Sequence, residues 1–178
     1  MRALRRIWNY LAVLRLARRN QSDLARWMIR RPQVLAATGL YETSLLLSNR
    51  VDPALKELAE LKVATLVTCE FCLDIGSALA LKSGLTEQQI TELTRYKSSP
   101  AYTELEKLVI EYAEVLTATP VVDQEELRKR LLQHLSRAQL AELAATIAWE
   151  NQRARLNQGL GVRATGMSDG AACALPDR

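Results

Sequence analysis

The segment from Asp52 to Val67 constrains the fold of this chain more than any other feature. It opens with Asp52-Pro53, an acid that can cap a helix followed by a proline suited to the first helical position. Apolar residues then follow almost without a break: Leu55, Leu58, Ala59, Leu61, Val63, Leu66 and Val67. A helix that is apolar on nearly every face is buried. We therefore predict a largely buried helix over residues 53–68.

The composition points to an all-α protein. Seven glycines and five prolines in 178 residues are too few for the many tight turns of an all-β chain. Leucine and alanine dominate, and aromatic residues make up 5% of the chain. Periodic patterns and caps predict further helices over residues 3–19, 22–31, 34–49, 71–83, 103–116, 123–134 and 136–156, with a short one from Thr86, where a capping-box pattern begins.

The length is enough for one domain with a proper core. We divide the chain into a basic amphipathic extension (1–31), a helical domain (32–162) and a flexible tail (163–178) rich in Gly, Ser, Asp, Ala and Pro. The extension carries nine arginines and one acid, so its net charge is +8, and the rest of the chain is mildly acidic at −4. No apolar run approaches the ~20 residues of a membrane span.

The basic helix over residues 3–19 has three interpretations. It can dock its apolar stripe on the body or on a neighbouring subunit, with Leu4, Ile7, Trp8, Leu11 and Leu14 forming the stripe. It can lie on an acidic membrane surface with Trp8 and Leu11 inserted and the arginines outward. It can also be a targeting peptide, because it is rich in Arg and poor in acids, although it lacks Ser enrichment. Nucleic-acid binding is disfavoured, since no recognisable reading motif follows the basic residues.

The candidate reactive residues are Cys69 and Cys72, which lie at a predicted helix start. Exposed N–H groups and the helix dipole stabilise a thiolate there. With this spacing, one sulfur can attack an oxidant and the other can resolve the sulfenic acid that forms. Zinc is disfavoured, because a structural site needs four nitrogen or sulfur ligands, the others in the chain are His134 and Cys173, and no second CxxC exists. The alternative without function is two buried thiols.

The residues around the pair resemble the signature of the AhpD-like proteins in the carboxymuconolactone decarboxylase superfamily. That family places a Glu twelve residues before the first Cys of a CxxC, and Glu57 and Cys69 match this spacing. It follows the motif with a helix of small residues and a Gly, as at Gly84, and the segment 150–161 is similar to its Asn/Arg-rich stretch before Leu-Gly. The resemblance covers residues 32–162.

This resemblance implies that Cys72 attacks a peroxide, that Cys69 resolves it and that Glu57 assists deprotonation as a buried base. One position departs from the family pattern. Peroxidase members carry a His four residues after the second Cys, where this chain has Gly76. Asp74 either handles protons together with Glu57 or simply favours the helix dipole. The alternative without function for Glu57 is a solvent-facing or salt-bridged side chain, with Glu60 on the same face.

We therefore predict a thiol-dependent peroxidase or disulfide reductase that needs no metal or organic cofactor. Its partners would be a small peroxide, an external dithiol reductant and further copies of the chain, since the resemblance implies trimers or hexamers. The alternatives are a non-catalytic redox-sensing or scaffolding oligomer and a decarboxylase-like enzyme, which the cysteines disfavour. We expect a reducing, cytoplasmic setting, peripheral to a membrane if the basic helix binds one. Near the C-terminus, Arg153, Arg155 and Asn151 could order a buried polar network or a subunit contact, and His134 has no assigned role.

Overall fold

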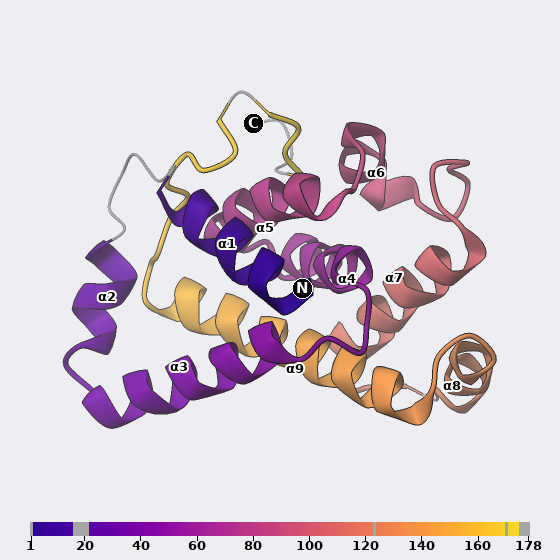
Figure 1. Ribbon diagram of the computed structural model, residues 1–178, viewed down its shortest axis with the longest axis horizontal. Coiled ribbons are helices and arrows are strands. Elements are labelled where there is room, and N and C mark those ends of the chain that lie inside the picture. Colours follow the sequence, from indigo (N-terminus) through magenta and orange to yellow (C-terminus); the bar gives the residue numbers. More distant parts are fainter. Residues whose placement is uncertain (1, 16–21, 123, 170, 175–178) are drawn as a thin grey trace.

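The computed structural model describes residues 2–15, 22–122, 124–169 and 171–174, and every regular element within these ranges is helical (Figure 1). The prediction of an all-α fold is therefore confirmed. In chain order the elements are α1 (Arg2–Leu14), α2 (Ser22–Met28), α3 (Pro32–Leu47), α4 (Pro53–Val67), α5 (Glu70–Ser83), α6 (Glu87–Thr91), the 3₁₀ helix η1 (Leu93–Arg95), α7 (Glu104–Thr117), α8 (Glu125–Leu132) and α9 (Arg137–Gly159).

Helix α4 is the centre of the bundle, as its apolar sequence predicts. It packs most extensively against α5, α7 and α9, which surround it in Figure 1. Its apolar residues divide between two clusters: Leu58 and Leu61 pack toward α5, whereas Ala59 and Val63 pack toward α7 and α9. The Asp52 side chain accepts a hydrogen bond from the Ala54 N–H at 2.9 Å and caps the helix. The predicted bounds 53–68 agree with α4 to one residue.

A tight turn joins α4 directly to α5 and positions the cysteine pair. Thr68 adopts the left-handed conformation (φ 57°), which is uncommon for a β-branched residue. The Cys69 N–H donates to the Ala64 carbonyl at 3.1 Å and the Thr68 N–H donates to the Thr65 carbonyl at 3.3 Å. These two bonds form a Schellman motif, which satisfies the last carbonyls of α4. Cys69 is therefore both the last residue of this motif and the N-cap of α5.

Local signals also predict several other helix ends correctly. Capping boxes are present at Thr86, Thr103 and Ser136, at the starts of α6, α7 and α9. Pro32 is the first residue of α3, so this helix starts two residues earlier than predicted and ends at Leu47 rather than Asn49. Helix α9 continues three residues past the predicted end, to Gly159. The predicted starting residue 123 of the helix before it lies outside the described residues.

The N-terminal extension packs on the body, but several residues of the predicted stripe face away from it. Helix α1 contacts α5 and α3 (Figure 1). Arg6 and Val13 are buried in this contact, whereas Leu4, Trp8 and Leu11 are exposed. Within the predicted stripe, Leu4, Trp8 and Leu11 thus lie on the outer face of α1, whereas Ile7 is partly buried. Residues 16–19 of the predicted helix lie outside the described residues, and membrane contact by residues 1–19 stays a prediction. Within the described ranges no helix is long and apolar enough to cross a membrane.

The segment after α9 differs from the flexible tail that we predict for residues 163–178. Asp74, almost fully buried in α5, accepts hydrogen bonds from the N–H groups of residues 165–168 at 2.7–3.0 Å and from the Ser168 hydroxyl. The Ser77 hydroxyl accepts a further bond from the Ala174 N–H. The Asp74 carboxylate thus holds the backbone of residues 165–168 against α5. Asp74 is an anchor for this segment rather than a dipole partner, and residues 175–178 lie outside the described residues.

Helix α3 leaves most of its apolar surface uncovered. None of its residues is buried, and Val34, Leu40 and Leu47 are 43%, 70% and 54% exposed. Large exposed apolar patches of this kind mark contact surfaces between proteins. Assembly of several copies stays a prediction.

We predict that Asp74→Ala lowers the free energy of unfolding by about 2–4 kcal/mol, because buried N–H groups lose a charged acceptor. Burial raises the pKa of Asp74, but hydrogen bonds from Met167, Ser168 and Thr165 outweigh burial and hold the pKa below its ordinary value. The difference between wild type and variant should thus be full above about pH 4 and shrink as the pH falls through the lowered folded-state pKa.

Urea unfolding followed by circular dichroism measures this difference at each pH. Asp169→Asn removes an exposed acid from the same segment and is the matched control, expected to leave stability within about 0.5 kcal/mol. Equal stability of Asp74→Ala and wild type at pH 7 would contradict the anchoring role.

Candidate functional site

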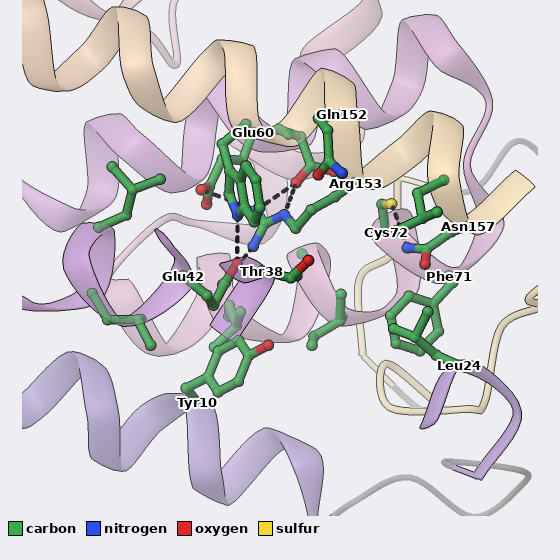
Figure 2. Close-up of a pocket in the computed structure, with 18 of the residues that line it drawn as sticks. Tyr10, Leu24, Thr38, Glu42, Glu60, Phe71, Cys72, Gln152, Arg153 and Asn157 are labelled. Carbon is green, nitrogen blue, oxygen red and sulfur yellow. Dashed lines mark hydrogen bonds and ion pairs between the residues drawn. The ribbon is translucent and has the colours of Figure 1, made fainter. Parts of the chain in front are cut away.

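A cavity of about 440 Å³ lies beside the cysteine pair, between the N-terminal helices and the α4–α5–α9 core. Its volume is in the range of small-molecule sites, roughly 300–1,000 Å³. Figure 2 shows Cys72, Phe71, Leu24 and Asn157 toward one end, and a polar group around Arg153 toward the other. Between them the wall is mainly apolar, with side chains that include Met28, Leu35, Leu46, Ile75, Leu79 and Leu156.

The two cysteines are bonded to each other but differ in their access to this cavity. They form a disulfide with a Cα–Cα distance of 5.2 Å, and both are almost fully buried. Cys72 is part of the cavity wall, whereas Cys69 is not among the lining residues. The Cys69 sulfur accepts a hydrogen bond from the Cys72 N–H at 3.3 Å at the start of α5. Only Cys72 therefore meets a molecule bound in the cavity.

Asn157, from α9, is the polar neighbour of Cys72. Its Nδ2 donates a hydrogen bond to the Cys72 sulfur at 3.6 Å, and its side chain is 4% exposed. An amide donor and the N-terminus of α5 both favour negative charge on this sulfur once the disulfide is reduced. Asn157 lies in the stretch 150–161 that resembles the family pattern, but its contact with Cys72 is not predictable from spacing.

The polar end of the cavity is organised by Arg153. Its guanidinium donates to Glu150 at 2.8 Å from the same helix, to Glu42 of α3 at 2.7 Å and to Glu60 of α4 at 3.1 Å (Figure 2). Burial raises the pKa of Glu150 to about 7 despite its contact with Arg153. The expected polar network around Arg153 is therefore present. Asn151 and Arg155 take no part in it and bond to each other instead.

Glu57 lies in the same cavity, buried and paired with Arg6 of α1 at 3.6 Å. Burial, with a smaller contribution from the Glu60 charge, raises the pKa of Glu57 to about 8, although Arg6 opposes this. At neutral pH most of these carboxyl groups are protonated, so Glu57 is better suited to donate a proton than to accept one. No hydrogen bond joins Glu57 to Cys72 among the described residues, and the two share the cavity wall.

Gly76 forms part of the cavity wall at the position where peroxidase members have His. A Cβ atom there would lie 3.3 Å from Leu61 Cδ1, tighter than an ordinary van der Waals contact. A larger side chain at this position requires Leu61 to move. The proton chemistry of this cavity therefore depends on side chains from other helices.

The remaining residues considered from sequence lie elsewhere. His134 is exposed just after α8, and Asp74 anchors the C-terminal segment. Cys173 accepts a hydrogen bond from Ser168 at 3.2 Å and is not in the cavity wall. Within the described ranges no three histidine, cysteine or acidic side chains are grouped to hold a metal ion.

Besides Asn157, four residues of the site are ones that the sequence does not single out. Arg6 and Tyr10 come from α1, Glu42 from α3 and Glu150 from α9. Arg6 is one of nine arginines in the extension, and nothing in its spacing distinguishes it. For Glu150 a weak signal existed, since it precedes Arg153 by three residues on one helix and such pairs interact.

Comparison with known proteins agrees with the resemblance seen in the sequence. Residues 32–115 match the model of the carboxymuconolactone decarboxylase family. The uncharacterised YnjA protein of Escherichia coli K12 is 30% identical over 128 residues, which cover 72% of this chain and 68% of YnjA. The uncharacterised YdfG protein of Bacillus subtilis 168 is 30% identical over 117 residues, 65% of this chain and 80% of YdfG.

Solved structures share the fold. A protein of unknown function from Agrobacterium tumefaciens, named as a candidate AhpD antioxidant defence protein, superposes with a TM-score of 0.73 at 21% identity, over 83% of this chain and 97% of that one. The debrominase Bmp8 superposes with a TM-score of 0.72 at 18% identity, over 79% and 75% of the two chains. With the sequence matches, the helical fold and the CxxC pair, these findings show that the chain belongs to the carboxymuconolactone decarboxylase family, with an AhpD-like fold.

Proposed function

We propose that this protein is a thiol-dependent peroxidase that reduces organic hydroperoxides with its CxxC pair. The observation that carries the proposal is the asymmetry of the two cysteines: Cys72 lines an apolar cavity, and its disulfide partner Cys69 lies behind it. An attacking thiol needs access to substrate, whereas a resolving thiol needs access only to the attacking sulfur. Membership of the family supports this division of roles.

The proposed cycle has three balanced steps. The Cys72 thiolate attacks the terminal peroxide oxygen, the O–O bond breaks, and the alkoxide leaves as an alcohol after taking up a proton. Cys72 is then a sulfenic acid. The Cys69 thiolate attacks this sulfur and expels hydroxide, which leaves as water, so that the disulfide forms. An external dithiol returns two electrons by thiol–disulfide exchange, as expected in a reducing compartment.

Asn157 and the start of α5 act on the first step. The Asn157 N–H and the positive end of the α5 dipole stabilise negative charge on the Cys72 sulfur, and the thiolate is the nucleophilic form. Gly76 stands where peroxidase members carry a His, so α5 offers no polar side chain at that position. The Asn157 side chain supplies a hydrogen bond to the Cys72 sulfur from α9 instead.

Glu57 acts as the proton source in this proposal. Its pKa of about 8 keeps most of the carboxyl protonated at neutral pH, so it can protonate the departing alkoxide directly or through water. This reverses the direction of proton transfer that the sequence suggests, where Glu57 is a base. Glu57 recovers its proton from solvent between cycles.

We predict that reduced wild-type protein mixed with one equivalent of cumene hydroperoxide rapidly loses two thiols and the mass of two hydrogen atoms. Cys72→Ser should show no rapid loss. Cys69→Ser should stop at the sulfenic acid of Cys72 and gain the mass of one oxygen atom, because no resolving thiol remains. Dimedone should then react with this sulfenic acid. Thiol titration and intact-mass spectrometry measure these outcomes.

Cys173→Ser is the control and should behave like wild type. Equal, slow thiol loss in wild type and Cys72→Ser, or oxidation confined to Cys173, would overturn the peroxidase proposal. The redox-sensing or scaffolding alternative would then account for the cysteine pair.

For Asn157, we expect Asn157→Leu to slow alkylation of reduced Cys72 by iodoacetamide about tenfold at pH 7, because a hydrogen bond to the charged sulfur is lost. Leucine has nearly the same size, so the cavity wall is kept. Asn151→Leu, on the same helix but away from Cys72, is the matched control and should leave the rate unchanged. The rate is followed by peptide mass spectrometry of Cys72, and an unchanged rate in Asn157→Leu would exclude the thiolate-stabilising role.

The role of Glu57 is tested by the pH dependence of the first step. The ratio of single-turnover oxidation rates, wild type over Glu57→Gln, should be roughly a hundredfold at pH 7 and should fall above pH 8 as the Glu57 carboxyl ionises. The ionisation of Cys72 changes both rates alike with pH, so its effect cancels in the ratio. Glu60→Gln removes a charge that raises the Glu57 pKa, so in that background the ratio should begin to fall at lower pH. A ratio of one at all pH values would remove Glu57 from the mechanism.

A further inference from the structure

One buried hydrogen-bond donor in the cavity wall has no acceptor. Arg6 is 8% exposed, and its guanidinium contacts the Leu45 carbonyl at 3.0 Å and Glu57 at 3.6 Å. Its Nε is a buried polar atom without a hydrogen-bond partner in the described part of the chain. An unsatisfied buried donor costs free energy, most of all on a charged group. A ligand oxygen that accepts from this Nε would remove that cost.

The charges around Arg6 restrict what that ligand can be. Four carboxyl groups line this cavity, Glu42, Glu57, Glu60 and Glu150, against the two guanidinium groups of Arg6 and Arg153. Because the Glu57 carboxyl is mostly protonated at neutral pH, the remaining carboxylates already balance the two guanidinium groups, and a ligand anion would add a buried charge without a partner. A ligand cation offers no lone pair to the Nε donor. A neutral oxygen acceptor, such as a carbonyl, satisfies both conditions.

Tyr10 adds a second donor to the same wall. It lies one turn after Arg6 on α1 and lines the cavity (Figure 2). Burial and the nearby Glu42 charge raise the pKa of Tyr10 to about 12, so its hydroxyl keeps its proton at physiological pH. Two donors on one helix face can hold one carbonyl oxygen, as in other polar anchors within apolar pockets.

We propose that Arg6 and Tyr10 bind a carbonyl-type oxygen of a neutral, mainly apolar ligand whose body extends along the cavity toward Cys72. The inference rests on the proposed function in one respect: it makes this ligand the hydroperoxide substrate, with its carbonyl group remote from the peroxide group. The ligand site itself rests on the cavity, the unpartnered donor and the charge of the wall. Substrates are thus selected by the N-terminal extension, while α5 and α9 supply the thiol and its hydrogen bond.

The test uses ligands that cannot react with a thiol. Octan-2-one, octanoate and octylammonium have the same chain length and differ in the charge of the head group. We expect isothermal titration of the full-length protein to give the tightest binding for octan-2-one. Arg6→Met keeps the aliphatic stem and removes the donors, and should weaken octan-2-one about tenfold. Arg15→Met removes an exposed arginine that follows α1 and is the matched control, expected to bind like wild type.

Tyr10→Phe removes one hydroxyl without removing a charge, and should weaken octan-2-one several-fold with an unchanged circular dichroism spectrum. It keeps the test valid if Arg6→Met perturbs α1. Tighter binding of octanoate or octylammonium, or affinity for octan-2-one that neither variant changes, would overturn the proposal. Dependence on Arg6 and Tyr10 without any peroxide turnover by Cys72 would keep this ligand site and refute the proposed peroxidase. Turnover of hydroperoxides without such dependence would do the reverse.

Discussion

Burial of helix α4 requires a counter-charge for each of its four charged side chains, and the rest of the structure depends on how these are supplied. Lys56 pairs with Glu142 of α9, Lys62 with Glu114 of α7, Glu60 with Arg153 of α9 and Glu57 with Arg6 of α1. Removing one partner of a buried pair costs about 3–5 kcal/mol, because the other charge is left uncompensated. The pairs therefore fix which faces of α1, α7 and α9 meet the central helix. Apolar packing alone would permit these helices to rotate or slide.

The four pairs are not equivalent, and the weakest of them lies at the site. Lys62 and Glu114 are 2.8 Å apart, and Lys56 also donates to the Ser48 carbonyl at 2.8 Å, whereas Arg6 stands 3.6 Å from Glu57. A loosely paired carboxyl group in an apolar cavity gains little from its partner, so burial dominates and its pKa rises. The same requirement that fixes the fold elsewhere thus yields a protonated acid beside the cavity. A tighter pair at this position would lower the pKa of Glu57 and remove the proposed proton source.

Local features of the structure could be predicted from the sequence, and long-range ones could not. The start of α4 at Asp52-Pro53 and the capping boxes at Thr86 and Ser136 depend on residues within one turn, so their signals survive in a single sequence. The anchoring of the C-terminal segment by Asp74 joins residues 91 positions apart, and the contact of Asn157 with Cys72 spans 85. Neither contact produces a periodic pattern in the sequence. Leu4, Trp8 and Leu11 of the predicted stripe on α1 face outward, since apolar spacing shows that a helix is amphipathic but not which face the protein covers.

The resemblance to the family located the cysteine pair and Glu57, but the replacement of His by Gly76 changes which elements complete the site. In this chain the hydrogen bond to the Cys72 sulfur comes from α9 and the charged partner of Glu57 comes from α1. Both helices also carry counter-charges of α4, so the side chains that hold the bundle together and those that surround the thiol come from the same elements. Changes in the N-terminal extension therefore act on stability and on the cavity at once. For that reason the extension belongs to the site, although the matched family region begins only at residue 32.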